Sequence, residues 1–230
     1  DASIMCGKTL EAGAVAAVRN IKNPISLAKV VMQHSDHIIL SGKGAKDFAR
    51  KMNIEFEPDQ YFFTQNRYDQ WMKIRDTDNY QLDHSAPVSP QNKFGTVGAV
   101  VLDQHGNLSA ATSTGGMTNK RYGRIGDSPI IGAGTYANNQ TCAVSCTGYG
   151  EYFIRAVTAY DVSCLMEYKG MSLREACETV INEKLVKLGG EGGLIAVDRN
   201  GNLELLFNSA GMYRAWKRNG KPMQTAIYQT

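Results

Sequence analysis

The apolar positions of the chain follow two spacings, and helical spacing predominates in the first 95 residues. Helix-like recurrence of apolar residues is found in three segments: 24–33, about 43–52 and parts of 60–75. The first has Asn23 at the N-cap position and Pro24 at the first helical position, which favours helix initiation. Short strands are predicted at 3–5 and 37–40, and residues 76–92 are predicted to form an exposed, poorly ordered connection.

From residue 96 onward the pattern becomes strand-like. The predicted strands are a hairpin of 96–103 with 108–114, a strand at 141–146, and a hairpin over 193–208 that turns at Asn200-Gly201. Helical spacing returns over 151–168 and about 172–188, and Ser172 with Glu175 matches a capping box at the start of the second of these helices. Hairpins and helices in this order predict sheet layers covered by helices, which is an α+β fold.

The composition, with 43% hydrophobic and 20% charged residues, is typical of a globular protein, and the length favours one domain. The net charge is +3 and the charges are evenly spread, so we expect no nucleic-acid partner. No apolar run approaches the ~18 residues of a membrane-spanning helix, and the first residues lack a signal-peptide pattern. We therefore expect neither a membrane protein nor a membrane partner.

The five cysteines are too few and too scattered for a disulfide framework, so reduced thiols are expected, which favours the cytoplasm. Cys142 and Cys146 are spaced like half of a metal site, but no second ligand pair follows at a suitable distance. In a strand these two side chains share one face, so we interpret them as buried core residues.

Two common kinds of site are poorly supported. Residues 132–137 match the dinucleotide pattern G-x-G-x-x-A, but a strand rather than a helix is predicted after them, so no helix N-terminus is available for a pyrophosphate. The four histidines are predicted to be solvated surface residues: His34, His37, His84 and His105. If the chain is a hydrolase, its general base should therefore be something other than histidine.

Five motifs in sequence order then give a specific resemblance: 95–100 (GTVGAV), 112–116 (TSTGG), 123–129 (GRIGDSP), 132–134 (GAG) and 147–151 (TGYGE). Together they resemble the plant-type asparaginase and isoaspartyl peptidase family, and the similarity extends from Asp1 to about Tyr228. That family belongs to the N-terminal nucleophile hydrolases. The resemblance implies a four-layer αββα sandwich, made as a precursor that cuts itself into two subunits which pair as a homodimer.

The implied cut lies between Gly95 and Thr96 and gives pieces of 95 and 135 residues. The first piece would be the α-subunit part with a linker at about 76–95, the second the β-subunit, and both together one structural domain. Glycine supports this boundary, because 5 of the 23 glycines precede position 96 and 18 follow it.

The chemistry of an N-terminal threonine explains why no histidine is needed. Once Thr96 begins a chain, its α-amino group, with a pKa of roughly 7.7–8.0, can act as the base for its own hydroxyl. In the precursor the same hydroxyl can attack the carbonyl of Gly95, and the missing side chain there leaves room for the approach. We expect no cofactor in this mechanism.

The resemblance also assigns the partners of Thr96. Thr114 would orient the nucleophile, while the Thr147 hydroxyl and the Gly148 N–H would form an oxyanion hole. Arg124 would bind the α-carboxylate and Asp127 the α-ammonium group of a small aspartyl substrate. L-asparagine and β-aspartyl (isoaspartyl) dipeptides both fit, and the motifs do not choose between them.

The sequence also departs from the family pattern. Cys6 stands where Asp is common, Tyr149 where Thr or His is usual, and Ala226 where Gly is usual. The family has a further segment upstream of the first predicted strand, and because this chain starts at Asp1 we expect one here too. A sodium-type ion site would lie in that segment, and without the segment the sheet would have an open edge. Two alternatives stay open: a glycosylasparaginase-like amidohydrolase and a non-catalytic, unprocessed fragment.

Overall fold

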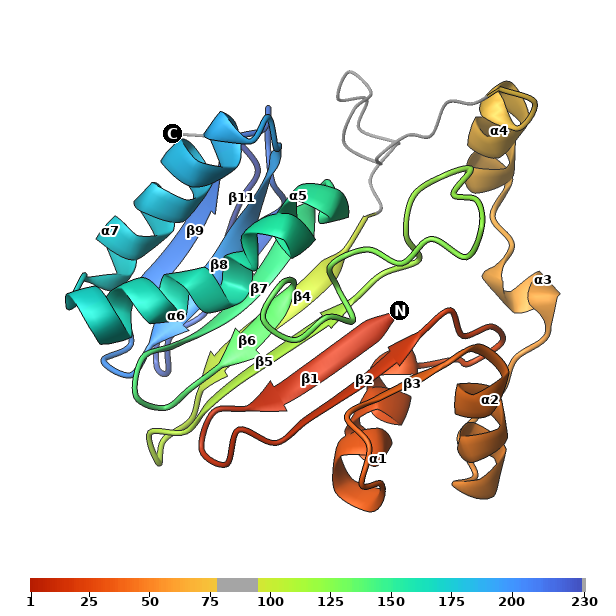
Figure 1. Ribbon diagram of the computed structural model, residues 1–230, viewed down its shortest axis with the longest axis horizontal. Helices are drawn as coiled ribbons and strands as arrows, with labels where there is room; N and C mark the ends of the chain where they lie inside the picture. The colour runs from red at the N-terminus through yellow and green to blue at the C-terminus, as the bar shows by residue number, and fades with distance from the viewer. Residues whose placement is uncertain (78–94, 229–230) are drawn as a thin grey trace.

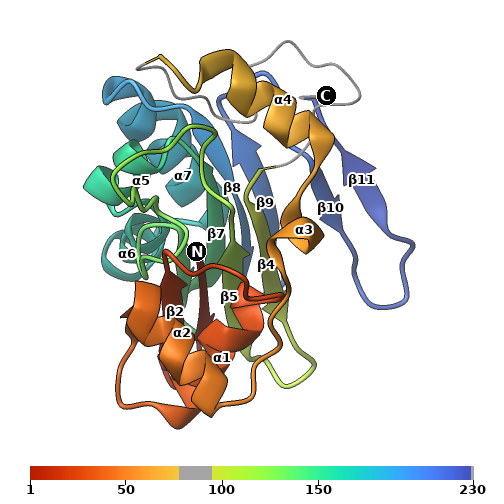
Figure 2. The same ribbon diagram turned by 90° about the vertical axis from the view of Figure 1, so that its right-hand side faces the viewer.

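The structure is a computed structural model that describes residues 1–77 and 95–228. Two β-sheets lie face to face, and helices cover the outer side of each, as Figures 1 and 2 show. The connection predicted over 76–92 lies, apart from its first two residues, outside the described residues, as does His84. The layered α+β architecture and its αββα order agree with the prediction.

The first sheet has five strands in the order β3-β2-β1-β5-β4, and only β2 and β3 are parallel. Its strands are β1 (Ala2–Cys6), β2 (Ala12–Ala16), β3 (Ile39–Ser41), β4 (Val97–Leu102) and β5 (Leu108–Ser113). β1 pairs with β5 in the register Ala2↔Ser113 to Cys6↔Ser109. Chain from both sides of the 95–96 bond therefore contributes to a single sheet.

The second sheet has four antiparallel strands in the order β6-β7-β8-β9. They are β6 (Thr135–Ala137), β7 (Cys142–Gly148), β8 (Gly192–Asp198) and β9 (Leu203–Phe207). A separate two-stranded ribbon near the C-terminus consists of β10 (Arg214–Trp216) and β11 (Gln224–Ala226).

The helices fall into three groups along the chain. α1 (Pro24–His34) and α2 (Gly42–Lys51) cover the first sheet, while α5 (Gly150–Ala156), α6 (Thr158–Lys169) and α7 (Leu173–Glu178) cover the second. A π-helical segment, Thr179–Leu185, continues α7, and the predicted capping box of Ser172 and Glu175 is present. The short α3 (Asp59–Phe62) and α4 (Gln65–Ile74) lie beyond α2 at the side of the molecule (Figure 1).

Three buried clusters correspond to the three interfaces between these layers. One joins β1 and β2 to α1 and α2 through residues such as Val15 and Leu27. Another joins β7 and β8 to α5, α6 and α7, with Phe153 fully buried at its centre. The third lies between the two sheets and contains Met5 and Leu108 from the first and Val197 from the second.

The strand β2 was absent from the sequence prediction. Every residue of β2 is buried, because β2 lies between two neighbouring strands and under α1, so its sequence AGAVA shows no alternation. Gly13 is required by this packing, since a methyl group there would lie 2.1 Å from the carbonyl oxygen of Ala28. The short strands β6, β10 and β11 were also not predicted, because three residues carry too little pattern.

The predicted helix over 151–168 is in fact two helices. Val157 separates α5 from α6 in a left-handed conformation, with φ 51° and ψ 45°. The first free N–H groups of α6, on Ala159 and Tyr160, donate to the carbonyl oxygens of Ala133 and Gly132 at 3.2 and 2.8 Å. The G-x-G-x-x-A segment thus caps α6 and continues into β6, and no helix follows it, as predicted.

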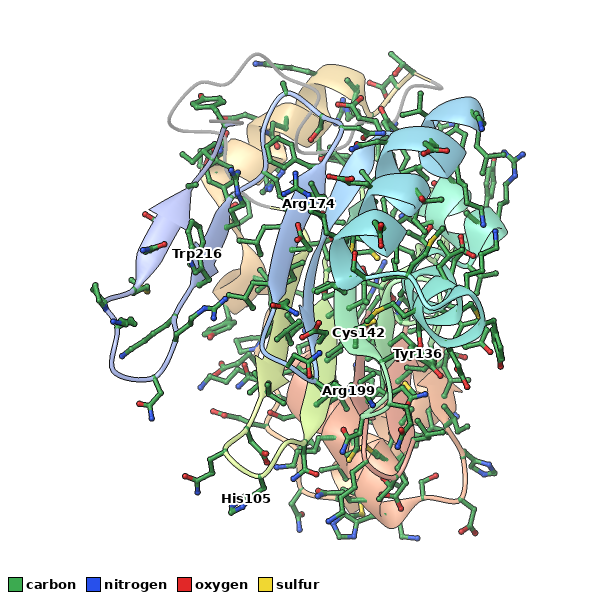
Figure 3. All side chains as sticks on the ribbon, turned by 90° about the vertical axis from the view of Figure 1, so that its left-hand side faces the viewer. His105, Tyr136, Cys142, Arg174, Arg199 and Trp216 are labelled. Atoms are coloured by element: carbon green, nitrogen blue, oxygen red, sulfur yellow. The ribbon has the colours of Figure 1, made fainter. Side chains whose placement is uncertain are left out.

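The cysteines and histidines lie where the sequence analysis placed them, as far as the chain is described. All five cysteines are free of disulfides, and Cys142 and Cys146 are buried on one face of β7. His34, His37 and His105 are exposed, and Figure 3 shows His105 at the tip of the β4–β5 hairpin.

Candidate active site

Residues from both sheets meet in one pocket. Thr96 precedes β4, Thr114 follows β5, and Thr147 and Gly148 end β7 on the facing sheet. Because Val97 pairs with Ser113, the β4–β5 ladder brings Thr96 beside Thr114. All seven residues singled out in the sequence line this pocket: Gly95, Thr96, Thr114, Arg124, Asp127, Thr147 and Gly148.

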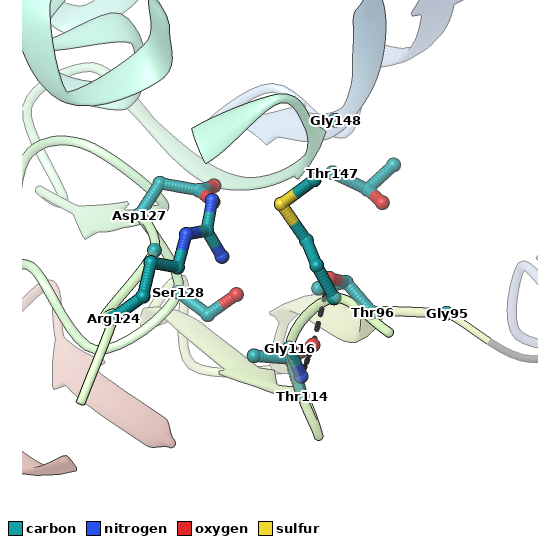
Figure 4. Close-up of a pocket in the computed structure, with 11 residues that line it drawn as sticks. Gly95, Thr96, Thr114, Gly116, Arg124, Asp127, Ser128, Thr147 and Gly148 are labelled. Carbon is teal, nitrogen blue, oxygen red and sulfur yellow. Dashed lines mark hydrogen bonds between the residues drawn. The ribbon is translucent and has the colours of Figure 1, made fainter. Parts of the chain in front are cut away.

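The hydroxyl of Thr96 donates a hydrogen bond to that of Thr114 over 3.2 Å. Thr114 is itself fixed, since its Oγ1 accepts from the N–H of Gly116 at 3.0 Å and its own N–H donates to the Asp1 carbonyl at 2.9 Å. Figure 4 shows this pair on one side of the pocket, with Arg124 and Asp127 on the other. The pair therefore faces two charged groups across a small space.

Arg124 is held by Glu151 in a two-point ion pair. Its Nε donates to Oε1 of Glu151 at 2.8 Å and its Nη2 donates to Oε2 at 2.7 Å. Hydrogen bonding to Arg124 holds the pKa of Glu151 below its usual value. Gly126 and Gly150 leave space for the guanidinium, since methyl groups there would lie 2.8 and 2.9 Å from its nitrogens. Glu151 ends the TGYGE motif, but its pairing with Arg124 was not predicted from the sequence.

Asp127 is buried, with only 4% of its surface exposed. Its Oδ2 has no hydrogen-bond partner among the described residues. Burial raises the pKa of the carboxyl from 3.8 to about 7, although backbone N–H groups and the charge of Arg124 oppose that shift. A buried acid that lines a pocket and has an unpaired oxygen is suited to a cationic donor.

Thr147 and Gly148, at the end of β7, form a further part of the pocket wall. Gly148 has φ +154°, and a methyl group there would lie 2.5 Å from the Glu191 carbonyl oxygen and 2.6 Å from the Phe153 ring. Only glycine fits where β7 turns into α5. Tyr149, the next residue, is half-buried and donates its N–H to the Glu191 carbonyl at 3.1 Å.

A row of buried hydroxyls beneath the pocket was not predicted from the sequence. Thr112 Oγ1 lies 2.7 Å from Ser145 Oγ, and Thr135 Oγ1 donates to Thr112 Oγ1 at 2.5 Å. Ser3 Oγ lies 2.8 Å from Thr135 Oγ1 and donates to the carbonyl of Ser128 at 2.6 Å. The row thus ties both sheets to the segment that carries Asp127. Four small hydroxyl residues on different strands give no sequence signal of this kind.

The free space in the pocket is about 20 Å³, which is room for about one water molecule. Gly95 forms part of its wall in the continuous chain, and Met117 is its one large apolar side chain. A wider cavity of about 380 Å³ adjoins it and is lined by Arg67, Trp71, Gly95 and residues 115–119. The two spaces share Gly95, Gly116 and Met117.

Other kinds of site find little support in the part of the chain that the structure describes. Within it, no three His, Cys, Asp or Glu residues group in a way that could hold a metal ion. No helix in the described ranges is both long and apolar enough to cross a membrane. The three described histidines do not line the pocket.

The sequence was also compared with known proteins. The family model described as asparaginase matches residues 1–227. The chain is 55% identical over 230 residues to the isoaspartyl peptidase of Escherichia coli K12, covering 100% of this chain and 72% of that protein.

Two eukaryotic relatives extend this similarity. The probable isoaspartyl peptidase/L-asparaginase 2 of Arabidopsis thaliana is 43% identical over 248 residues, covering 100% of this chain and 75% of that protein. The isoaspartyl peptidase/L-asparaginase of Mus musculus is 43% identical over 221 residues, covering 96% and 66%. The matched region includes both sheets and every residue of the pocket, so the chain belongs to the asparaginase family whose members include the isoaspartyl peptidases.

Proposed function

We propose that this chain is a threonine-dependent amidohydrolase that cuts itself between Gly95 and Thr96 and then hydrolyses L-asparagine, β-aspartyl dipeptides or both. The observation that carries the proposal is the Thr96–Thr114 hydroxyl pair, 3.2 Å apart, in one pocket with Arg124 and Asp127. The names of the relatives, isoaspartyl peptidase and L-asparaginase, support the substrate class.

Maturation would begin at the hydroxyl of Thr96. Its Oγ1 attacks the carbonyl carbon of Gly95, and the hydroxyl proton passes to the Thr96 nitrogen as the peptide C–N bond breaks, so that the acyl group moves from nitrogen to oxygen. Water then hydrolyses the ester and leaves a carboxylate on Gly95 and a free α-amine on Thr96. Departure of Gly95 from the pocket wall would also enlarge a space that now has room for about one water.

Turnover would use the same oxygen with a new base. The Thr96 amine takes the hydroxyl proton as Oγ1 attacks the β-carbonyl carbon of the substrate. The Thr147 hydroxyl and the Gly148 N–H stabilise the oxyanion. The amine returns the proton to the leaving nitrogen, and water then hydrolyses the acyl-threonine ester to release aspartate. We propose that no cofactor takes part, because every step uses groups of this chain.

The charged side of the pocket would bind the amino-acid head group. Asp127 offers an unpaired carboxylate oxygen to an α-ammonium group, and Arg124, held by Glu151, offers its remaining donor edge to an α-carboxylate. These contacts place the β-amide opposite Thr96, which explains selection for aspartyl compounds.

Replacement of Thr96 tests the proposal. The Thr96→Ala variant removes the nucleophile, so we expect an uncut chain and a loss of asparagine hydrolysis of more than about 10³-fold. The Thr96→Ser variant is the matched control, because it keeps a hydroxyl and should still be cut and retain activity. Intact-mass measurement and ammonia release are the readouts. Turnover by an uncut Thr96→Ala protein would contradict the mechanism.

Assays on asparagine and on a glycosylated asparagine, together with intact-mass measurement, separate the two alternatives. A glycosylasparaginase-like enzyme would prefer a glycosylated asparagine to asparagine, and a non-catalytic fragment would neither be cut nor release ammonia.

We further propose that processed units pair as a homodimer and that the protein acts in the cytoplasm. The second of these proposals rests on the small number of cysteines and on their being free thiols.

A further inference from the structure

The turn that follows β5, residues 114–120, holds the hydrogen-bond partner of Thr96. The N–H of Gly116 donates to Thr114 Oγ1 at 3.0 Å, and the same oxygen accepts the hydroxyl of Thr96 at 3.2 Å. Figure 4 shows Gly116 and Thr114 together at the wall of the pocket. Since Gly116 occupies one lone pair of Thr114 Oγ1, the other is left for Thr96. The turn therefore determines how the Thr96 hydroxyl is oriented.

The side chain of Lys120 folds back over Gly116. A methyl group at position 116 would lie 2.7 Å from Lys120 Nζ and 2.9 Å from its Cδ, so a side chain there would displace the lysine. Gly116 has φ +89°, in the left-handed region that favours glycine. The N–H of Lys120 donates to the Met117 carbonyl at 3.3 Å, which bends the chain back toward Gly116.

The ammonium group of Lys120 reaches a buried carboxylate. Its Nζ lies 3.6 Å from Oδ2 of Asp1, whose side chain is 2% exposed. Oδ1 of Asp1 accepts from the N–H of Ala17 at 2.7 Å, but Oδ2 has no hydrogen-bond partner in the part of the chain that the structure describes. A buried carboxylate needs a compensating charge, and Lys120 supplies one.

Asp1 is also joined to Thr114 through the backbone. The nitrogen of Asp1 donates to the Thr114 carbonyl at 3.1 Å, and the N–H of Thr114 donates to the Asp1 carbonyl at 2.9 Å. Asp1 therefore holds the first residue of the turn through its backbone and the last, Lys120, through its side chain. A cavity of about 710 Å³ borders all three residues, so a lysine released from Asp1 has room to leave the turn.

We propose that the Lys120–Asp1 ion pair positions the nucleophile Thr96. It closes the turn so that the Gly116 N–H stays on the hydroxyl oxygen of Thr114, which in turn orients Thr96. This role rests on the proposed function. Neither Lys120 nor Asp1 lines the active-site pocket, so the pair acts through Thr114 and not on the substrate. Its loss should therefore lower kcat and leave KM nearly unchanged.

The Lys120→Met variant tests this role, because it removes the charge and keeps an apolar side chain that can cover Gly116. We expect kcat for asparagine, counted per cut chain, to fall about tenfold or more, with KM changed less than about twofold. Lys120→Arg keeps a cation that can reach Asp1 and should recover most of the lost kcat. Steady-state kinetics gives both constants, and intact-mass measurement gives the cut fraction.

Lys22→Met is the matched control for the loss of an ion pair. The Lys22 side chain is 30% exposed, against 32% for Lys120, and its Nζ pairs with Glu55 Oε1 at 2.7 Å. Lys22 does not line the active-site pocket or the cavity beside the turn, so its replacement should change neither kcat nor KM. A fall in kcat as large as that of Lys120→Met would overturn the positioning role.

Asp1→Asn is a second, gentler variant, because its side-chain oxygen can still accept from the Ala17 N–H. It should lower kcat by about the same factor as Lys120→Met, and the double variant should fall no further, since both changes break one interaction. Losses that multiply in the double variant, or an unchanged kcat in either single variant, would overturn the role and leave the amidohydrolase proposal in place. If the unaltered, cut protein hydrolysed neither asparagine nor a β-aspartyl dipeptide, the proposed function would fail, and the positioning role with it.

Discussion

Asp127 carries the most unusual electrostatics of the site. Its pKa is raised to about 7 chiefly by burial, and one of its oxygens has no hydrogen-bond partner in the described residues. The charge of Arg124 lowers that pKa and the charge of Glu151 raises it, and these two side chains form an ion pair with each other. A cationic ligand would supply the missing partner and favour the ionised carboxylate. Binding and proton release from Asp127 should therefore be linked.

This linkage gives a pH dependence with a definite sign. Below about pH 7 the free protein holds Asp127 increasingly as the neutral acid, which attracts an ammonium group poorly. We expect KM for asparagine to rise by up to about tenfold per pH unit as the pH falls below about 7, because binding must first remove that proton. Steady-state kinetics of the processed enzyme between pH 5 and pH 9 measures it.

The Asp127→Asn variant is the control for that assignment. It should have a high KM at all pH values and lose the rise at low pH, while any titration of the Thr96 amine in kcat remains.

The effect of pH on folding stability has the opposite sign to its effect on substrate binding. Since the folded-state pKa is raised, ionisation of Asp127 destabilises the fold progressively from about pH 4 to about pH 7. The variant should escape this loss, and a KM independent of pH in the unaltered protein would contradict the linkage.

Among the elements, the junction between α5 and α6 stores local strain. Val157 is a β-branched residue with φ 51°, a conformation that costs about 1–3 kcal/mol for residues other than glycine. The break turns α5 toward the pocket, where Gly150 and Glu151 lie beside Asp127 and Arg124. The carbonyl groups of Gly132 and Ala133 keep α6 in place on the other side.

Replacing Val157 with glycine should relieve this strain. Val157 is 44% exposed, so the change removes a side chain that is only partly buried, and we expect the relief of strain to outweigh that loss and to raise Tm by about 2–4 °C. Val157→Ala keeps a Cβ atom and thus the strain, so it should not raise Tm. Thermal unfolding followed by circular dichroism compares the two. A glycine variant no more stable than the alanine variant would show that the junction is unstrained.

Elements with a strong local signal could be predicted from the sequence. The hairpins β4–β5 and β8–β9 share the turn pattern D-x-x-G-N, and in both the aspartate accepts bonds from the backbone two and four residues on, as Asp103 does from His105 and Asn107. The break at Val157 could not be predicted, because valine carries no breaking signal and the cap comes from the GAG segment. The strand β2 could not be predicted either, because all of its residues are buried and its sequence shows no alternation of polar and apolar residues.

The candidate site, like the fold, was predicted only in part from the sequence. Its residues were identified through the family resemblance that the five sequence motifs carry, and the fold brings all of them to one pocket. The ion pair of Glu151 with Arg124 and the hydroxyl row through Ser3 were missed, because each depends on contacts between distant strands and turns.

On the scale of the whole molecule, the proposed cut falls inside one folded unit. Residues before 96 supply β1, β2 and β3 of the first sheet, and residues after it supply β4 and β5. The buried cluster between the sheets also combines both parts, with Met5 and Ala12 from the first and Leu108 and Val197 from the second. Separation would expose this surface and leave one edge of β1 and one edge of β5 without a paired strand.

The two pieces should therefore stay together after cleavage. In native buffer we expect the 95- and 135-residue pieces to co-elute on gel filtration, whereas a denaturing gel should separate them. The uncut Thr96→Ala protein is the reference for the native elution volume, because it contains the same strands in one chain. Elution of two separate native species would contradict the shared sheet, since β1 pairs with β5 over five residues and neither piece retains a complete first sheet alone.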